Sequence, residues 1–535
     1  MSSGTRPVSH LSPWQQAALL VGITLAVFLP TLSAGFVYDA RLQILTDPFL
    51  HDPRNWLPVL TFGTLSMDVL DFNRPVNLAS LMLDAAVLGK EPFGYHLTSV
   101  LLHAANVLMV WGVLRRLSPS LPLGASMRKE ADLSVSVRAT AASLLPPLLF
   151  AVHPVVTEAV CEPTFREDLL VAFFTLAGLF LAIGHAASAF DGWRAAGCVA
   201  CSLLAIGSKE SGIAAPAVIG VYWLVVRRRE RGLFWPVSFG GGTLVVIVFL
   251  IARFLLEPTP SKIFEARPQY PGGSLAAALA IEPRILALYA QLILLPLNQC
   301  ADYGLFSVRH LPLPVAIPIV AGLTVAAWFM IRADHRMAVA VALVVFSLLP
   351  VANLVPIYRA AADRYLYLPM AGVALGVGCL LTAPWLAHRE WLRQRLVIGA
   401  AAAALLLGFG CMERQKVWAN PLALWTDTFQ KNPVAYTAAS GLAEALREAG
   451  RFAEAEQAAR RAIELAEGQR GDPWATLALI LDAQGRVAEA FDALDKAIEA
   501  DPKLADPDAR VAVMAMERPY ADDLKRLQAR RIAPH

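Results

Sequence analysis

Residues 233–255 read LFWPVSFGGGTLVVIVFLIARFL, with Arg253 as their one charged side chain. A helix that crosses the hydrocarbon core of a bilayer needs about 20 mostly apolar residues, so this stretch predicts a membrane span. The whole chain has the same character: 56% of its 535 residues are hydrophobic, 17% are charged, and the mean hydropathy is +0.52. Soluble globular chains have about 25% charged residues. The composition therefore excludes a soluble enzyme, a disordered protein and a nucleic-acid binder.

Ten further apolar runs predict additional spans, and the chain is expected to be an all-α polytopic membrane bundle of about 11 transmembrane helices over residues 1–412. A stretch at 275–297 is also apolar, and we expect it to lie outside the bundle, in or near the membrane interface. The ten runs are 14–34, 96–114, 139–157, 169–187, 195–207, 211–226, 313–331, 337–356, 370–387 and 396–412.

Loop charge predicts the orientation of the bundle. Short loops rich in Lys and Arg stay in the cytoplasm. The N-terminal segment and alternate loops hold 16 basic and 6 acidic residues, against 13 and 17 on the opposite side up to residue 412. We therefore expect a cytoplasmic N-terminus and, after an odd number of spans, a C-terminus on the periplasmic or lumenal side. The Ala- and Arg-rich usage and short loops favour a bacterial inner membrane.

The tail, residues 413–535, is polar and repetitive. It contains 37 of the 89 charged residues, and six small or apolar positions recur at a spacing of 35. This resembles the tetratricopeptide repeat, whose period is about 34. Two repeats bury little core, so 413–433 and 508–531 are expected to pack as flanking helices. A cap on the bundle and a docking surface for polypeptide both remain open. The recurring positions are Leu442, Ala443, Leu446, Gly450, Ala455 and Ala462, matched by Leu477, Ala478, Leu481, Gly485, Ala490 and Ala497.

Ionisable and polar residues gather at the outer ends of the predicted spans, whereas the cytoplasmic loops hold basic anchors. Charges near membrane depth are costly, which makes them candidates for function. The candidate site residues are Asp39, Arg74, His153, Glu158, Arg166, Asp168, Lys209, Glu210, Asp363, Arg364 and Tyr365.

Seven short motifs in this order resemble the transmembrane and tetratricopeptide repeat-containing O-mannosyltransferases, which are C-type glycosyltransferases. The likeness covers roughly residues 20–535, including the repeat tail. The motifs are Phe-Val-Tyr-Asp at 36–39, Arg-Pro at 74–75, Gly-x-His-Leu at 94–97, Phe-Ala-x-His-Pro-x-x-x-Glu-Ala-Val at 150–160, Arg-x-Asp-Leu-Leu at 166–170, Ser-Lys-Glu at 208–210 and Arg-Tyr-Leu-Tyr-Leu-Pro at 364–369.

The resemblance implies transfer of a sugar, with mannose as the family's choice, from a polyprenyl-phosphate donor to Ser or Thr hydroxyls of proteins. It places the catalytic acid just after the first span, at Asp39. A carboxylate there can remove the acceptor's proton during attack on the anomeric carbon, and a single displacement inverts that centre. Arg364, Arg74 and Lys209 are the expected ligands of the donor phosphate. No other cofactor is implied.

Three positions depart from the family pattern. The family has a second acid after the first, where this chain has Ala40, and Asp68 or Asp71 could substitute for it. Phe165 replaces a Gly, and Asp363 replaces a Glu. The missing acid keeps open a catalytically silent scaffold that assembles partners on its repeats, and a transferase that acts on a lipid or glycan acceptor is a second alternative.

Structural readings of the same residues also remain open. Asp39 could be held by Arg41 or Arg74, and Arg364 could be an interfacial anchor. Lys209 and Glu210 could form a salt-bridged turn. The set of His153, Glu158, Arg166 and Asp168 could form one interhelical polar network, or line a sugar or acceptor pocket. A divalent cation on His153, Glu158, Glu162 and Asp168 is a further alternative, although the spacing predicts no metal site.

Overall fold

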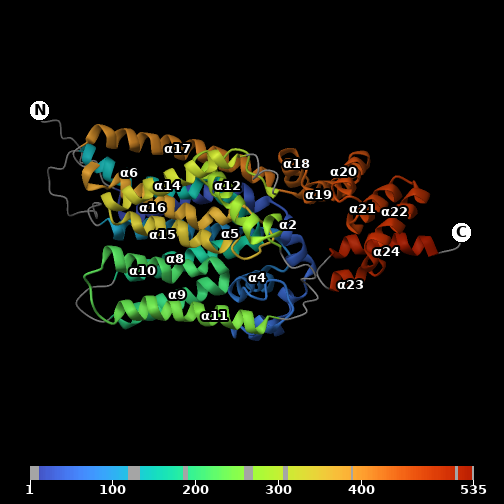
Figure 1. Cartoon of the computed structure of the whole chain (residues 1–535), viewed down its shortest axis with the longest axis horizontal. Helices are drawn as coiled ribbons and strands as arrows, with labels where there is room; N and C mark the ends of the chain where they lie inside the picture. Colours follow the sequence, from blue (N-terminus) through green and yellow to red (C-terminus); the bar gives the residue numbers. More distant parts are fainter. Residues whose placement is uncertain are drawn as a thin grey trace, which may run out of the picture.

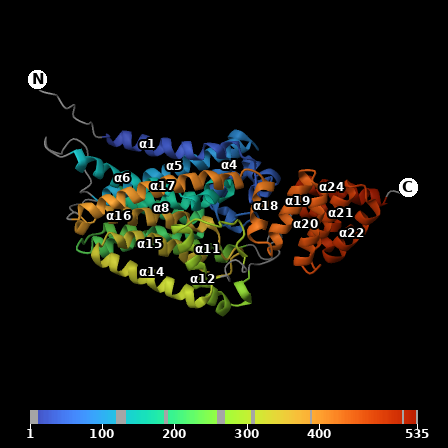
Figure 2. The same cartoon turned by 90° about the horizontal axis from the view of Figure 1, so that it is seen from above.

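The computed structural model describes residues 11–118, 133–184, 191–257, 269–304, 311–386, 389–512 and 516–532, and every regular element in these ranges is helical. The predicted all-α class is therefore confirmed. The long helices form an elongated bundle, and the C-terminal helices form a second unit at one end of it (Figures 1 and 2). Part of the first basic loop, residues 119–132, lies outside the described ranges.

The bundle is built from thirteen described helices of 8 to 28 residues, with short helices and turns between them. All eleven predicted runs are helical over most of their length. The helices are α1 (Pro13–Phe28), α4 (Pro75–Leu88), α5 (Pro92–Leu117), α6 (Leu133–Val152), α8 (Arg166–Ile183), α9 (Gly192–Ser208), α10 (Ala214–Val221), α11 (Gly242–Leu256), α12 (Leu275–Leu294), α14 (Leu313–Ala333), α15 (Met337–Leu348), α16 (Tyr367–Leu381) and α17 (Glu390–Val417).

Seven helices of the described chain are long and apolar enough to cross a membrane, or eight if one bent pair counts as a single span. The chain is thus an integral membrane protein. The other predicted spans are shorter, bent or charged at one end; α8, for example, begins with Arg166, Glu167 and Asp168. The qualifying segments are Pro13–Ser33, Pro92–Leu117, Pro236–Leu256, Leu275–Leu294, Leu313–Ala333, Asp363–Leu381 and Glu390–Val417.

The described parts of the basic loops lie at the end of the bundle away from the C-terminal unit (Figure 1). There Arg116 donates to the carbonyl of Phe180, and Arg336 Nη1 donates to Ser118 Oγ at 2.6 Å. The candidate site residues lie at the opposite end, next to the C-terminal unit, which we call the tail end. This separation agrees with the alternation of loops that the sequence predicts.

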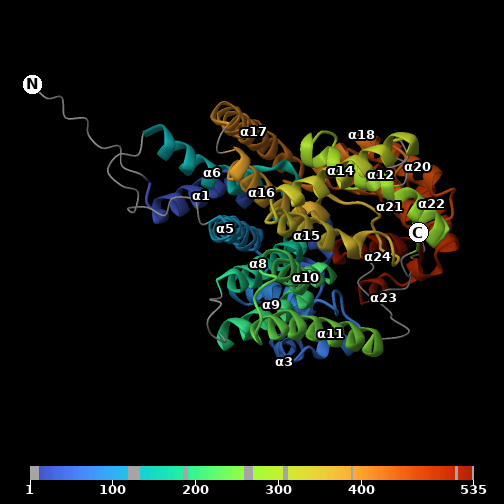
Figure 3. The ribbon, with the colours of Figure 1, turned by 60° about the vertical axis from the view of Figure 1, so that its left-hand side comes forward.

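Helix α12 begins and ends near the tail end. Before it, Tyr270 donates to the carbonyl of Leu354 at 3.3 Å, and at its last turn the carbonyl of Ile293 lies 2.9 Å from His153 Nε2. Helices α12 and α14 lie side by side and are the outermost helices on one flank (Figures 2 and 3). Helix α12 is long and apolar enough to cross a membrane. Its position in the membrane interface, which we expect from the sequence, stays a prediction.

A break in the third span positions several candidate residues. Helix α6 ends at Val152, and the next helical segment, Pro154–Cys161, is bent from it by 48°. Pro154 has no N–H to continue the helix and favours an extended residue before it. His153 is extended (φ −75°, ψ 129°), and its Nδ1 accepts from Val155 N at 3.2 Å. The following short helix α7 (Thr157–Cys161) thereby carries Glu158 into the tail end.

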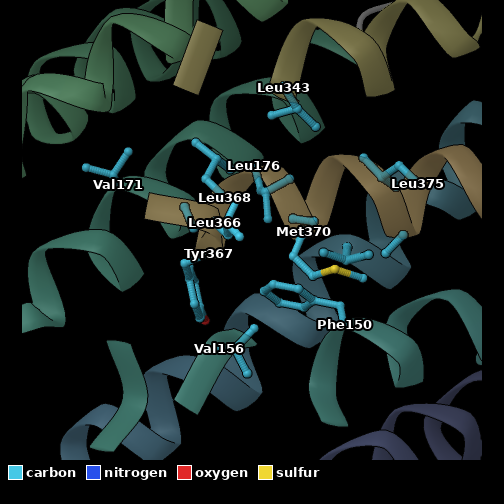
Figure 4. Close-up of a cluster of buried hydrophobic side chains, with 14 of the residues drawn as sticks. Phe150, Val156, Val171, Leu176, Leu343, Leu366, Tyr367, Leu368, Met370 and Leu375 are labelled. Atoms are coloured by element: carbon cyan, nitrogen blue, oxygen red, sulfur yellow. The ribbon is translucent and has the colours of Figure 1, made fainter. Parts of the chain in front are cut away.

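One large apolar core holds the bundle together. Buried side chains from α5, α6, α8, α15 and α16 meet in it, and Figure 4 shows Phe150, Leu176, Leu343 and Met370 converging. Helix α8 is the centre of this packing because it contacts α5, α9, α10 and α16. Burial on several sides fixes the start of α8, and this start carries three charged residues.

The tail folds as the predicted helical repeats. Its helices are α18 (Pro421–Lys431), α19 (Tyr436–Glu448), α20 (Phe452–Leu465), α21 (Gly471–Ala483), α22 (Val487–Ala500), α23 (Pro507–Ala512) and α24 (Arg518–Ile532). Successive helices from α18 to α22 pack against one another, and α24 packs on α21. The expected flanking helices are thus present, and they cover a shared apolar core.

The repeated glycines make the turns inside the two hairpins. Gly450 and Gly485 have φ of 73° and 78°, in the left-handed region that a side chain disfavours. Each ends the first helix of its hairpin, which explains why both recur at the spacing of 35. The period of the sequence is therefore the period of the helix pairs.

Candidate active site

Asp39 lies on a turn held in an unusual backbone conformation. Tyr38 has φ of 50°, which is uncommon for a bulky residue. Its ring stacks on Trp425 at 5.6 Å between centroids and meets Phe165 edge-on at 5.8 Å. Arg359 lies 5.8 Å from the same ring. Because surrounding contacts maintain such strained positions, these rings fix the place of the next residue, Asp39.

The Asp39 side chain is exposed, and no hydrogen bond or ion pair occupies its carboxylate within the described part of the chain. The surrounding protein nevertheless limits its contact with bulk water, and this desolvation raises the pKa of Asp39 above the ordinary value, against the opposing attraction of Arg364 and Arg359. Arg41 and Arg74, which were possible partners of Asp39 from the sequence, bind other carboxylates. Asp39 is therefore an acid without a partner among the described residues, and two cations lie close enough to act on its charge.

Arg364 is buried and pairs with Glu158. Its Nη1 contacts Glu158 Oε1, and its backbone N–H donates to Oε2 of the same carboxylate at 3.3 Å. The guanidinium also lies 4.0 Å from the ring centroid of Phe165. Its Nε and Nη2 have no protein acceptor among the described residues. Arg364 thus keeps donors for a further anion while one carboxylate fixes its position.

Phe165 and Arg359 extend the site beyond the predicted residues. Phe165 stands where the family pattern has Gly, and its ring fills the space between Tyr38 and Arg364. Arg359 Nη1 pairs with Asp302 Oδ2 at 2.6 Å. No motif in the sequence marks Arg359, because it lies in an irregular segment before the Arg-Tyr motif and reaches Asp302 from a distant loop.

Glu162 is the buried acid next to the Asp39 turn. Its Oε1 accepts from Ala40 N at 2.9 Å and from Thr164 Oγ1 at 2.7 Å, whereas Oε2 is buried without a partner. Burial raises the pKa of the Glu162 carboxyl well above the ordinary range, because desolvation disfavours its charged form. Ala40 stands where the family has its second acid, and from the sequence Asp68 or Asp71 could substitute for that acid. Glu162 is the acid that contacts this position.

Arg74 and Lys209 belong to one chain of ion pairs. Arg74 Nη1 lies 2.6 Å from Glu167 Oε2 and 2.9 Å from Asp71 Oδ1. Lys209 Nζ lies 3.0 Å from Glu167 Oε1 and 2.6 Å from Asp168 Oδ2. Lys209 is therefore matched by two carboxylates and Arg74 by three, counting Glu210 at 3.4 Å, which leaves both cations less able than Arg364 to bind a phosphate.

The predicted Lys209–Glu210 salt bridge is wrong. Lys209 is directed to the start of α8, whereas Glu210 contacts Arg253 at 3.1 Å, Arg74 Nη2 at 3.4 Å and Asn73 at 2.6 Å. The backbone explains the difference, because Lys209 is extended (φ −167°, ψ 159°) and the two successive side chains diverge. Lys209 and Glu210 therefore join different parts of the bundle.

Arg166 is a structural residue of the bundle interior. It is 0% exposed, and its Nη2 lies 2.6 Å from Asp84 Oδ2 and donates to the carbonyl of Tyr95 at 2.9 Å. Further bonds reach Ser80 and Ser99. No partner of Arg166 was predictable from the sequence, because helix α4, which carries Asp84, lay in the predicted outer loop.

The single polar network predicted for four residues is not formed, because each contacts a different element. Glu158 pairs with Arg364, and Asp168 pairs with Lys209. Arg166 pairs with Asp84, and His153 contacts the carbonyl of Ile293. Among the residues that the structure describes, no group of three His, Cys, Asp or Glu side chains is arranged to hold a metal ion. The alternative cation site on these residues therefore has no support.

Asp363 and Tyr365 flank Arg364. Asp363 accepts from Gln299 Nε2 at 2.8 Å and from the Tyr303 hydroxyl at 2.5 Å. The Tyr365 ring lies 5.2 Å from both Lys209 Nζ and the guanidinium carbon of Arg364. Tyr365 also lines a small pocket together with Asp168, Val171, Lys209, Ser211, Ser347, Val351 and Leu368. A small polar and apolar space therefore lies next to Arg364.

Comparisons with known proteins give the following similarities. The tetratricopeptide repeat family matches residues 472–504. The protein O-mannosyl-transferase F38B6.6 of Caenorhabditis elegans is 23% identical over 84% of this chain and 62% of its own length. The protein O-mannosyl-transferase TMTC2 of Mus musculus is 32% identical over 39% of this chain and 24% of its own length. The chain therefore spans less than two thirds of these relatives.

Among solved structures, the chain is similar to ArnT from Cupriavidus metallidurans bound to undecaprenyl phosphate. The two are 17% identical, with a TM-score of 0.44, over 97% of this chain and 89% of that one. The similarity to the curated relatives and the repeat in the tail confirm the resemblance of this chain to the transmembrane and tetratricopeptide repeat-containing O-mannosyltransferases.

Proposed function

We propose that the protein is an integral membrane glycosyltransferase that moves a sugar, mannose in the first instance, from a polyprenyl-phosphate donor to Ser or Thr hydroxyls of proteins. The observation that carries the proposal is Asp39, an exposed acid without a partner in the described chain, placed beside Arg364 and Arg359 at the tail end. The similarity to protein O-mannosyl-transferases supports the substrate class.

In this proposal Asp39 is the general base. The acceptor hydroxyl gives its proton to Asp39 as its oxygen attacks the anomeric carbon, and the bond from that carbon to the donor phosphate breaks. The phosphate leaves as an anion, so it needs a cation and no proton. Arg364 has free donors for this anion, and Glu158 holds its guanidinium in place. One displacement inverts the anomeric centre.

Arg364 is the proposed phosphate ligand, with Arg74 and Lys209 as weaker candidates because carboxylates already surround them. Replacing Arg364 with Lys keeps the charge but loses the forked geometry. We expect R364K to raise the KM for the lipid donor about 10-fold and R364A about 100-fold, in line with the loss of a charge-assisted hydrogen bond of about 1.5–3 kcal/mol. Initial rates at varied donor concentration measure both effects. An unchanged KM in R364A would dismiss this role.

The pH dependence of the reaction follows from Asp39. A base must be deprotonated to act, so kcat/KM falls on acidification. An ordinary aspartate has a pKa of about 4, and desolvation raises the pKa of Asp39, so we expect this fall at a pH above about 4. Arg359 lowers this pKa by its charge. The variant R359M is therefore expected to move the acidic limb of the profile to higher pH. A limb that stays in place would argue against Asp39 as the titrating group.

The direct test of the proposal is an assay with purified protein, radiolabelled polyprenyl-phosphate sugars and three classes of acceptor. Label on a Ser- or Thr-containing peptide supports the proposal, and label on a lipid or glycan alone identifies the alternative transferase. The absence of any transfer or donor hydrolysis, in a preparation that is folded, would support the scaffold alternative. Varying the sugar head group identifies the donor.

We further propose that the N-terminus is cytoplasmic, that the site and tail face the periplasm of a bacterial inner membrane, and that the repeats present the acceptor polypeptide. The bundle contacts membrane lipids, and nucleic acid has no part in the proposal. The reaction as proposed needs no resident metal, because the leaving phosphate meets Arg364. Full activity in excess chelator is expected, and loss of activity that added Mg²⁺ or Mn²⁺ restores would contradict this point.

A further inference from the structure

The residue two positions after Asp39 is bound by the tail. Arg41 opens the turn Arg41–Thr46, and its guanidinium contacts two tail carboxylates at once. Nη1 and Nη2 bind the two oxygens of Glu448 at 2.8 and 2.5 Å, and Nε and Nη2 lie 3.0 and 2.8 Å from Glu517 Oε2. Glu448 ends α19, and Glu517 precedes α24. The two helices therefore meet at one arginine of the first outer loop.

The geometry of this contact is specific. A guanidinium that binds one carboxylate with two parallel bonds and a second through its remaining edge has a defined orientation, unlike a single exposed ion pair. The Arg41 side chain is 18% exposed, compared with 49% for Arg451 in the neighbouring Arg451–Glu454 pair. Arg41 is thus part of a contact surface between the loop and the tail.

Two further contacts join the tail to the same turn. Trp425 of α18 stacks on Tyr38. The Thr437 hydroxyl of α19 binds Asp302, whose carboxylate also pairs with Arg359 beside the Tyr38 ring. The turn that carries Asp39 is therefore contacted by the tail on both sides of the acid, through Tyr38 before it and Arg41 after it.

The turn needs such support because its own sequence does not favour it. Tyr38 at φ 50° is not a glycine, and residues in this region persist where surrounding contacts outweigh the local cost. A relaxed Tyr38 would move the Asp39 carboxylate, and displacement by about 1 Å can cost a catalytic group about 100-fold in rate. The contacts that hold the turn therefore bear on the reaction itself.

We propose that the tetratricopeptide tail positions the turn that carries Asp39, through the ion pairs of Glu448 and Glu517 with Arg41. This role is in addition to presenting the acceptor. Arg41, Glu448 and Glu517 are positioning residues, and this role rests on the proposed function of Asp39. Hydrolysis of the lipid donor, in which water replaces the acceptor, is then dependent on the tail even though no polypeptide takes part.

The test uses the full-length protein and point variants, because deletion of the tail would remove both roles together. The variants are R41A, R41K, the pair E448Q/E517Q, the triple variant R41A/E448Q/E517Q and the control E454Q, which alters an exposed tail carboxylate away from the loop. Donor hydrolysis gives kcat and KM, and hydrogen exchange of the backbone over residues 36–46 reports on the turn without any substrate.

The proposal expects R41A and E448Q/E517Q each to lower kcat for hydrolysis about 10-fold with KM unchanged, and to speed exchange over 36–46. The triple variant is expected to be no worse than R41A, because all three side chains form one contact. R41K is expected to be intermediate, and E454Q to match wild type.

Three outcomes would overturn the proposal: an unchanged kcat in E448Q/E517Q, effects that multiply in the triple variant, or a rise in KM without a fall in kcat. If the folded wild-type protein neither transfers sugar nor hydrolyses donor, the proposed function fails, and the effect of the tail on catalysis fails with it. Exchange over 36–46 then still decides whether the tail holds the turn, and unchanged exchange in E448Q/E517Q would show that it does not.

Discussion

Replacing Asp39 with Asn is expected to lower kcat for sugar transfer by about 10²–10⁴-fold, the usual contribution of a general base. Asn matches Asp in size and cannot take a proton. Because no described side chain binds the Asp39 carboxylate, the substitution breaks no contact of the fold. We expect unchanged expression, an unchanged melting temperature and a nearly unchanged KM for the donor.

The matched control for this variant is D52N. Asp52 also lies in the segment between α1 and α4, but it pairs with Arg54, whose side chain is 88% exposed. It is expected to keep wild-type kinetics. The general-base role of Asp39 would be refuted by a folded D39N protein that transfers sugar at the wild-type rate, or by an equal loss in D52N.

The second large effect is on stability. The variant R166A is expected to lower the free energy of unfolding by about 3–5 kcal/mol, because removal of one partner leaves a buried and uncompensated charge. Arg166 is fully buried, and Asp84 lies 2.6 Å from it with its own side chain 6% exposed. The bond from Arg166 to the Tyr95 carbonyl would also be lost, so the start of α8 would separate from α4 and α5.

Thermal and denaturant unfolding in detergent measures this effect, with R54A as the exposed control. Surface ion pairs contribute about 0–1 kcal/mol, so R54A is expected to unfold like wild type. The double variant D84L/R166M replaces the pair with apolar side chains of similar size and is expected to recover much of the loss. Equal stabilities of R166A and R54A would show that Arg166 does not support the bundle.

The helices of the bundle were predictable because a bilayer imposes a simple requirement on the sequence. Every predicted run is helical, and the period of 35 in the tail corresponds to its helix pairs. Helix α4 (Pro75–Leu88) was missed. Its 14 residues are too short for a span, and Asp84 interrupts its apolar pattern. The other helices were predicted from apolar runs long enough to span a bilayer, and α4 is not such a run.

Individual residues of the candidate site were predictable from the sequence, but the contacts between them were not. Asp39, Arg364 and Glu158 all come from motifs in the sequence, yet the partner of Arg364 lies 206 positions away. Lys209 and Glu210 illustrate the same limit, because neighbours in sequence were expected to pair and instead reach α8 and Arg74. Pairing depends on how helices pack, and short motifs do not encode it.

Two features of the site depend on tertiary structure alone. The hydrogen bond from Ala40 N to Glu162 brings a second acid to the Asp39 turn from 122 residues further along the chain. Arg41 meets carboxylates 407 and 476 positions away. No local pattern marks either residue, since a single Glu or Arg in a loop is common on any protein surface.

The most direct test of the central claim is the anomeric configuration of the sugar in the product of the purified wild-type protein. The protein is given a polyprenyl-phosphate mannose of defined configuration and a Ser- or Thr-containing peptide, and the product is analysed by NMR. Transfer to the hydroxyl with an inverted anomeric centre is predicted, because Asp39 deprotonates the acceptor in a single displacement. Retention of configuration, or no transfer to any acceptor by the folded protein, would contradict the account.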